Sequence, residues 1–328
     1  MSGEKEQPLV SIITPCYNSS RYIHGCIESV QAQDYPRVEH IVQDGGSRDG
    51  TLEILRAYGG QIDWVSEPDE GQADGLNRAL QRCGGELIIV LNADDELLPD
   101  AVSWGVENMA KNPDAAVVYG DQYIIDDEGE IVDLDPGPDP YDFIKVLCVE
   151  SIIPAQAAFI RRSCWEKVGL YADTALATCP DYEMWVRIGR HFPMVHIPGF
   201  ITRYRAHQGS RGRDKGAIIE MHDTKRSVMD RLFDESVLPQ DIRALKKRAH
   251  AGAKSWTASI LYHENDTFTG LRYACEAFLL YPGKIQGKFL SIYLLRVIFP
   301  PGYKWLHRRL MIKYEIVAAG KKGGGCSC

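Results

Sequence analysis

The chain has 328 residues, of which 45% are hydrophobic and 25% charged, as in a globular protein with one large domain and an appendage, or with two domains. The nine cysteines form no CxxC pair, and the short charged stretch from Met1 to Pro8 lacks the pattern of a signal peptide. We therefore expect a reducing, cytosolic setting with buried free thiols.

The net charge of −8 conceals an asymmetry along the chain. Residues 1–202 carry 14 Lys and Arg against 34 Asp and Glu, whereas residues 203–328 carry 23 against 11. An acidic first part suits metal-binding carboxylates, and a basic second part suits an anionic surface such as phospholipid. Nucleic acid is not expected as a partner, because the sequence has no helix-turn-helix, zinc-finger or RNP pattern.

In chain order, strand and helix patterns alternate through the first half. We expect strands at residues 9–13, 38–42, 62–65, 86–91 and 115–119, and helices at 21–33, from 52 onward and at 72–83. This alternation predicts an α/β fold with a mostly parallel sheet flanked by helices. Polar residues follow each of the first four strands. Because ligands bind beyond the carboxyl ends of strands in such sheets, we expect these residues to share a cleft.

The pattern is less regular beyond residue 120. Residues 126–130 predict a hairpin turn, and the Pro-rich residues 135–140 and the loop at 205–213 are candidate lids. From about residue 216 the pattern is helical, with a pair of helices expected at 241–261 and 267–280. We therefore expect a catalytic domain at residues 1–212 and a helical, basic region at residues 213–328.

The apolar stretch at residues 289–299 is too short to span a bilayer, which needs about 20 residues. Aromatic and basic residues follow it as far as Lys313, and this combination suits attachment to a membrane interface. A buried helix that packs on the catalytic domain is an equal alternative. The final Cys326-Ser327-Cys328 resembles a prenylation signal, which we interpret as coincidence.

Asp94 and Asp95 follow directly after the apolar run at residues 86–91, which reads as a strand buried on both faces. Two acids at such a strand end suit Mg²⁺ or Mn²⁺, which proteins hold with one or two carboxylates and the phosphates of a substrate. The alternative is that the acids cap a helix, because Leu97-Leu98-Pro99 follows them.

Asp44 ends the second strand and precedes two glycines, which permit tight turns and close approach of the backbone to a ligand. A carboxylate at this point can accept a hydrogen bond from the N–H of a nucleotide base. The alternative is an Asp that only forms the turn.

These segments together resemble the family 2 glycosyltransferases, which have the GT-A fold and use nucleotide sugars. The resemblance covers about residues 8–210 and rests on seven segments whose order and spacing match. They are Val10–Asn18, Asp44–Thr51, Glu67–Asn77, Leu91–Asp95, Phe159–Arg162, Val168–Tyr171 and Pro180–Arg187.

The resemblance implies roles for residues of the donor site. They are Thr14, Pro15 and Tyr17 in the base pocket, Asp44 and Ser47 beside the base, Asp74 and Asn77 on the nucleotide sugar, and Ala93 and Asp94 in the metal motif. The first position of that motif is usually Asp, but here it is Asn92, which leaves direct metal ligation to Asp94. The loop Tyr204–Ser210 resembles the family's flexible loop over the diphosphate. It implies His207 as a further metal ligand or phosphate contact, and Arg205 as a neutralising charge.

Asp181 matches the position of the family's catalytic base. An inverting transfer needs one carboxylate that takes the proton from the acceptor hydroxyl. Asp181 also precedes a helical pattern, so it is alternatively an N-cap, and both roles are compatible. Glu183, two residues further on, is expected to face elsewhere.

The sequence thus predicts an inverting, metal-dependent glycosyltransferase of the hexosyltransferase type that uses Mn²⁺ or Mg²⁺. Its donor would be a nucleoside-diphosphate sugar, UDP-linked by preference, and its acceptor a hydroxyl of a glycan or lipid-linked glycan in cell-surface polysaccharide synthesis. We expect it in the cytoplasm, peripheral on the inner face of the membrane. The alternatives are a nucleotidyltransferase, for which the sequence lacks a Gly-rich phosphate loop, and a non-catalytic nucleotide-sugar-binding scaffold, which Asn92 favours.

Overall fold

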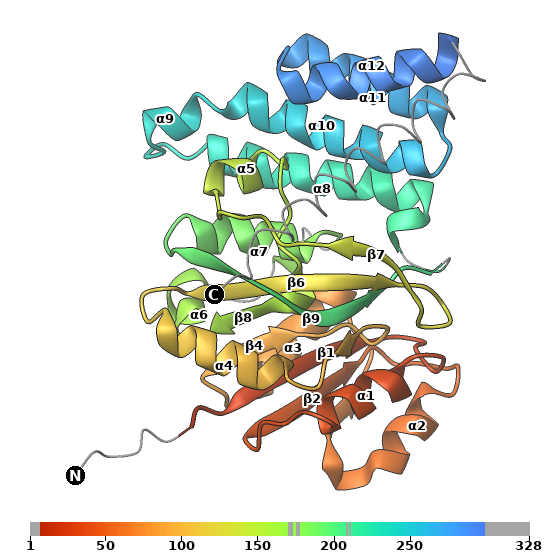
Figure 1. Cartoon of the computed structure of the whole chain (residues 1–328), viewed down its shortest axis with the longest axis vertical. Helices are drawn as coiled ribbons and strands as arrows, with labels where there is room; N and C mark the ends of the chain where they lie inside the picture. The colour runs from red at the N-terminus through yellow and green to blue at the C-terminus, as the bar shows by residue number, and fades with distance from the viewer. Residues whose placement is uncertain (1–6, 170–172, 175–177, 208, 210, 299–328) are drawn as a thin grey trace, which may run out of the picture. The chain divides into compact units, whose positions relative to one another are not determined.

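The computed structural model describes residues 7–169, 173–174, 178–207, 209 and 211–298 (Figure 1). It forms two compact units, Met1–Lys246 and Lys247–Cys328. We predicted a boundary at residues 212–213 as the end of the catalytic region. The division into compact units does not test where that region ends, so this boundary stays a prediction. The aromatic and basic residues around Lys313 and the terminal Cys326-Ser327-Cys328 lie outside the described residues.

The first half of the chain builds a parallel sheet with the strand order β3-β2-β1-β4. Its strands are β1 (Val10–Cys16), β2 (Val38–Asp44), β3 (Asp63–Ser66) and β4 (Leu87–Val90). The helices between them are α1 (Ile23–Gln31), α2 (Thr51–Tyr58) and α3 (Gln72–Arg82). The predicted alternation of strands and helices is therefore confirmed, and the carboxyl ends of these four strands meet at one edge.

Residues 96–205 continue the same sheet in the order β8-β6-β9-β5, with β7 paired to β6. These strands are β5 (Glu96–Leu97), β6 (Val117–Ile125), β7 (Ile131–Asp135), β8 (Ala158–Arg161) and β9 (Met194–Arg205). β6 and β9 are parallel, but β8 runs antiparallel to both β4 and β6, and β5 runs antiparallel to β9. The sheet is thus parallel in the part formed by β3, β2, β1 and β4 and mixed beyond it.

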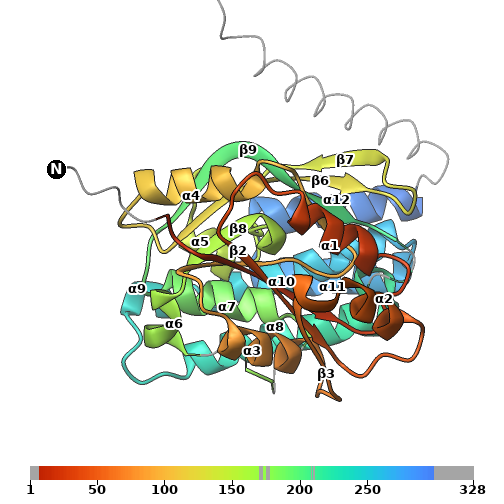
Figure 2. The same cartoon turned by 90° about the horizontal axis from the view of Figure 1, so that it is seen from below.

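Two hydrophobic cores cover the two faces of this sheet. Successive residues alternate between them: Ile12 and Ile89 pack with α1, α2 and α4 (Ala101–Lys111), whereas Ile13 and Ile88 pack with α3, α6 (Ser163–Val168) and α7 (Pro180–Gly189). Figure 2 shows α3, α6 and α7 on the side of the sheet opposite α4. Full burial of each such aliphatic side chain contributes about 1.5–3 kcal/mol to the stability of the fold. Because both faces of the strands are buried, their sequences are continuous apolar runs.

The remaining helices of the first unit are α5 (Phe143–Leu147), α8 (Lys215–Phe233) and α9 (Gln240–Arg243). Short 3-10 turns lie at Gly59–Gln61, Ala155–Ala157 and Arg211–Arg213. The second unit contains almost all of α10 (Lys246–His263), together with α11 (Thr267–Leu280) and α12 (Lys284–Ile298), which pack against each other. None of the helices in the described part of the chain combines the length and apolarity needed to cross a bilayer.

Candidate active site

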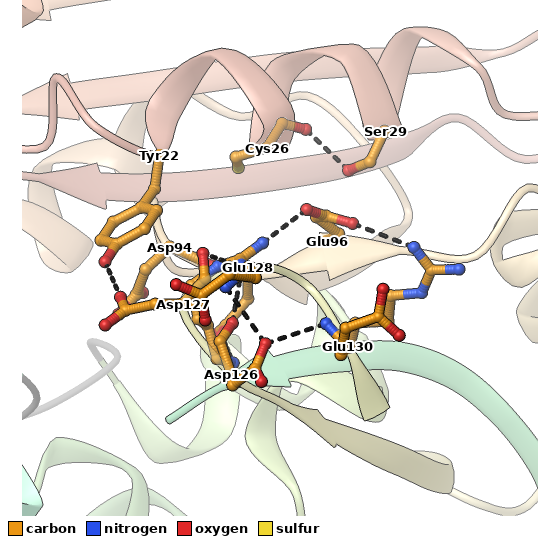
Figure 3. A network of polar contacts seen from close by, with 12 residues as sticks. Tyr22, Cys26, Ser29, Asp94, Glu96, Asp126, Asp127, Glu128 and Glu130 are labelled. Atoms are coloured by element: carbon orange, nitrogen blue, oxygen red, sulfur yellow. Dashed lines mark hydrogen bonds and ion pairs between the residues drawn. The ribbon is translucent and has the colours of Figure 1, made fainter. Parts of the chain in front are cut away.

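Asp94 lies in the loop between β4 and β5, at the carboxyl edge of the parallel strands (Figure 3). Its side chain is 31% exposed, and its Oδ2 lies 3.0 Å from Nε2 of His207. The backbone N–H of Gly209 donates to Nδ1 of His207, so the other ring nitrogen carries the proton and donates it to Asp94. Oδ1 of Asp94 receives no hydrogen bond from the described residues. The structure therefore brings the two predicted metal-binding side chains together.

The neighbouring Asp95 has no exposed surface. Its Oδ1 accepts from the backbone N–H of Arg205 at 2.8 Å, and its Oδ2 accepts from Nδ2 of Asn92 at 3.1 Å. Burial, and then the negative charge of Asp94, raise the pKa of Asp95 well above its ordinary value. This placement argues against Asp95 as a direct metal ligand. The alternative of a helix cap is wrong, because β5 follows Asp95 and α4 begins only at Ala101.

Arg205 holds in place the loop that contains Asp94, here called the metal loop. Its side chain is 8% exposed, and its guanidinium donates to the backbone carbonyl of Asp94 at 3.0 Å and to Glu96 Oε1 at 2.7 Å. A third nitrogen donates to the backbone carbonyl of Asp126 at 2.8 Å. We expected Arg205 to neutralise charge on the diphosphate. Its donors instead hold together the ends of β4 and β9 and the β6–β7 hairpin, so it is a positioning residue in this structure.

The predicted turn at residues 126–130 is confirmed as the tip of the β6–β7 hairpin. Figure 3 shows this tip beside Asp94 and Tyr22, which precedes α1. The Tyr22 hydroxyl donates to Asp127, and the ring of Tyr22 lies 4.9 Å from that of His207. The hairpin therefore borders the Asp94 site, a role that sequence reasoning did not assign because residues more than 100 positions apart meet here.

Asp181 lies in the first turn of α7, where Cys179 is the N-cap and Pro180 the first helical residue. Its Oδ1 accepts from the N–H of Tyr182 at 2.8 Å, and its other oxygen receives no hydrogen bond from the described residues. Glu183 makes a two-bond ion pair with Arg187, at 2.8 and 2.7 Å, and faces away as expected.

Tyr204 lies on β9, and the charges of both Asp181 and Asp94 act on its hydroxyl. Burial raises the pKa of the Tyr204 hydroxyl, and the negative charges of Asp95, Asp94 and Asp181 raise it further. The metal loop and the first turn of α7 therefore both lie within electrostatic range of the partly buried Tyr204.

Asp44 ends β2 and has no exposed surface. Its Oδ2 accepts from the N–H groups of Gly46 and Ser47, at 3.0 and 2.9 Å, and from Ser66 Oγ at 2.6 Å. Its Oδ1 accepts from the hydroxyl of Ser47 and from Cys16 Sγ. Burial acts to raise the pKa of Asp44, but these hydrogen bonds outweigh it and the pKa is lowered. All its lone pairs are engaged, which fits the turn-forming alternative and leaves a direct contact with a base little room.

Ser47 and Thr14 are buried close to Asp44. The hydroxyl of Ser47 accepts from the N–H of Asn18 at 2.7 Å, which holds the loop after β1 against the loop after β2. Thr14 Oγ1 lies 2.9 Å from His40 Nε2. Pro15 is partly buried, whereas Tyr17 is 62% exposed at the strand edge. The predicted base-pocket residues therefore cluster, although the two hydroxyls among them face the protein.

The first turns of α3 border the metal loop. Gln72 Nε2 donates to Asn92 Oδ1 at 3.1 Å, so the neutral residue of the metal motif bridges α3 and Asp95. Asp74 pairs with Arg78 at 2.7 Å. Asn77 and Ala93 are buried, at 4% and 5% exposure. Asp74 is the most accessible of the predicted contacts on this helix, with 19% of its side chain exposed.

These residues can hold a divalent cation only if a bound substrate supplies further ligands. Among the described residues, no group of three or more His, Cys, Asp and Glu side chains is arranged to hold a metal. Asp94 offers a partly exposed carboxylate and His207 an adjacent imidazole. Mg²⁺ and Mn²⁺ are held in this way when phosphates and water complete the shell. The donor set therefore suits a cation that arrives with a diphosphate.

The sequence model described as "Glycosyl transferase family 2" matches residues 11–169. An uncharacterized glycosyltransferase of Mycobacterium tuberculosis is 34% identical over 185 residues, which are 55% of this chain and 68% of that protein. A chondroitin synthase of Escherichia coli is 30% identical over 196 residues, 59% of this chain but only 28% of that synthase.

Solved structures share the fold. S. aureus TarS 1–349 in complex with UDP-GlcNAc has a TM-score of 0.59 at 14% identity, covering 98% of this chain and 93% of that one. The match to a longer TarS chain covers 54% of that chain. The mannosyltransferase PcManGT from Pyrobaculum calidifontis, with GDP-Man and Mn²⁺, has a TM-score of 0.58 at 19% identity, covering 92% and 88%. The mixed sheet with helices on both faces is thus the GT-A fold of glycosyltransferases, as predicted. With the match to the mycobacterial relative, this shows that the chain belongs to glycosyl transferase family 2.

Proposed function

We propose that this protein transfers a sugar from a nucleoside-diphosphate sugar, UDP-linked by preference, to a hydroxyl of a glycan or lipid-linked glycan, with inversion at the anomeric carbon. One observation supports the proposal: Asp94 and Asp181, whose charges both raise the pKa of the Tyr204 hydroxyl, each present an oxygen that receives no hydrogen bond from the described residues. A diphosphate at one side and a proton acceptor at the other are what an inverting transfer needs.

Asp181 is the proposed base. Its free oxygen takes the proton of the acceptor hydroxyl as that oxygen bonds to the anomeric carbon. The bond from the anomeric carbon to the phosphate oxygen breaks on the opposite side, and the nucleoside diphosphate leaves. The N–H of Tyr182 at 2.8 Å orients the carboxylate.

Asp94, with His207, would hold a divalent cation, which when bound neutralises the charge that develops on the departing diphosphate. Coordination through Nε2 of His207 requires that ring nitrogen to give up its proton. Arg205 and Glu96 keep the loop around Asp94 in position whether or not the cation is present.

The test is Mn²⁺-dependent hydrolysis and transfer from a panel of nucleotide sugars, with Asp181→Asn beside the unaltered protein. We expect turnover to fall about 10³-fold, because general-base catalysis contributes factors of this size. Binding of UDP with Mn²⁺, measured by calorimetry, should change less than about twofold. Glu183→Gln, on the same helix turn but paired with Arg187, is the control that should keep its activity. Full activity of Asp181→Asn would refute the assignment, and donor binding without turnover in the unaltered protein would favour the scaffold alternative.

We further propose that the basic second part of the chain binds an anionic membrane surface, so that the enzyme acts on the cytoplasmic face and serves cell-surface polysaccharide synthesis. Within the second unit, Phe268 and Leu279 on α11 are each 83% exposed. Apolar side chains at the surface of a basic helical unit suit an interfacial attachment. Sedimentation with vesicles of phosphatidylcholine, with and without phosphatidylserine, tests this, and equal recovery with both would refute it.

A further inference from the structure

Asp69, in the loop between β3 and α3, is a carboxylate that the donor site described above does not use. This loop is tied to the end of β2: the Ser66 hydroxyl donates to Asp44, and the N–H of Glu67 donates to the backbone carbonyl of Asp44 at 3.0 Å. The residues that follow in this loop, Asp69 among them, therefore lie at the strand ends, where the nucleotide is expected.

Two glycines make room for this carboxylate. A Cβ built on Gly45 would lie 2.8 Å from Asp69 Oδ2, and one built on Gly75 would lie 3.0 Å from the same atom. Real Cβ atoms essentially never make a contact as short as the first, and the second is unusually tight, so the Asp69 carboxylate would have to shift to admit a side chain at either position. Gly45 has no positive φ, so the absence of a side chain matters here for the position of the Asp69 carboxylate and not for the backbone conformation.

Oδ1 and Oδ2 of Asp69 differ in their partners. Oδ1 accepts from the N–H of Gly71 at 2.9 Å, whereas Oδ2 receives no hydrogen bond from the described residues. Burial, and next the charge of Asp74, raise the pKa of Asp69. A partly buried acceptor without a donor is costly unless a ligand supplies one.

An exposed tyrosine lies at the end of the neighbouring strand β1. The N–H of Gly45 donates to the carbonyl of Cys16 at 2.9 Å, and the next residue, Tyr17, is 62% exposed. An exposed ring at the same strand edge as Asp69 suits a flat ligand that stacks on the ring and donates from its edge.

We propose that Asp69 accepts the ring N–H of the nucleotide base, and so selects uracil or guanine over cytosine and adenine, whose facing ring nitrogens carry no hydrogen. The proposal rests on the function proposed above and places the base-reading carboxylate at Asp69 in place of Asp44, whose oxygens are already engaged. Charged acceptors of this kind contribute about 10- to 100-fold in affinity.

The test is calorimetric binding of UDP, CDP, GDP and ADP, with Mn²⁺, to the full chain. The unaltered protein should prefer UDP over CDP, or GDP over ADP, by about 10-fold or more. Asp69→Asn should reduce that ratio to near one, because an amide can turn its N–H toward the bare ring nitrogen. Gly45→Ala should do the same without a change of charge, because its Cβ displaces Oδ2.

Glu70→Gln and Gly60→Ala are the matched controls and should keep the full ratio. Glu70 is exposed, and a Cβ on Gly60 meets nothing within 4 Å. If both Asp69→Asn and Gly45→Ala bind UDP with the discrimination of the unaltered protein, the inference is overturned and the proposed function stands. If the unaltered protein binds none of the four nucleotides, the proposed function fails, and the inference fails with it.

Discussion

The ends of β2 and β4 hold two buried carboxylates that look alike in sequence and differ in chemistry. Asp44 and Asp95 have no exposed surface, and each lies close to a second Asp that keeps a free oxygen, Asp69 and Asp94 respectively. Five hydrogen bonds lower the pKa of Asp44 in spite of burial, whereas Asp95, with fewer bonds and a charged neighbour, has its pKa raised. Although neither side chain has exposed surface, the number of donors and the neighbouring charge shift the two pKa values in opposite directions.

A division of labour follows from this comparison. The buried member of each pair shapes its loop, and the partly exposed member meets the ligand. Substitution of Asp by Asn at each position tests this difference in roles, because it removes the negative charge with little change of shape.

Asp94→Asn should have the largest effect. It removes the accessible negative charge of the metal loop, so Mn²⁺-dependent turnover should fall at least about 10²-fold, since charge stabilisation by a bound cation is worth several kcal/mol. The measurement is activity and UDP affinity as functions of Mn²⁺ concentration. Asp95→Asn is the matched control and should retain its Mn²⁺ dependence. Equal losses in the two variants would contradict the division of labour at β4.

Asp44→Asn should act on stability. The amide nitrogen of Asn cannot accept, so the hydrogen bonds at one oxygen are lost and those at the other become neutral, which we expect to lower the free energy of unfolding by about 2 kcal/mol. Because the folded pKa of Asp44 is lowered, its stabilisation is present above the unfolded value of about 4 and is lost as pH falls through the folded pKa. Urea unfolding between pH 7 and acid should show that this loss is missing in the variant. An unfolding free energy equal to that of the unaltered protein at pH 7 would refute the account.

Asp95→Asn should have the smallest effect, within about 0.5 kcal/mol at acidic pH. The amides of Asn92 and Gln72 can turn over and re-form the chain of hydrogen bonds. The folded pKa of Asp95 is raised, so the unaltered protein loses stability as pH rises from about 4 through that pKa, and the variant does not. The variant should therefore be relatively more stable at neutral than at acidic pH. The opposite trend would show that Asp95 is ionised in the folded protein.

Much of the fold was predictable from the sequence, because it depends on local periodicity. The runs around Ile12 and Ile89 alternate too little to be surface strands, and the 3.6-residue stripe of α3 marks a packed helix. The Gly and Asp residues directly after the strands predicted a ligand site at that edge of the sheet. The segments that resemble family 2 glycosyltransferases pointed to a family that the mycobacterial relative confirms.

Only the tertiary structure decided which of the strand-end carboxylates are free. The donors that engage Asp95 and Asp44 include Arg205 and Ser66, which lie 110 and 22 residues away in the chain. The space that admits Asp69 is made by Gly45 and Gly75, which no local pattern relates to it. Sequence periodicity specifies which face of an element is buried, but the hydrogen-bond count of a polar side chain depends on groups brought beside it by folding.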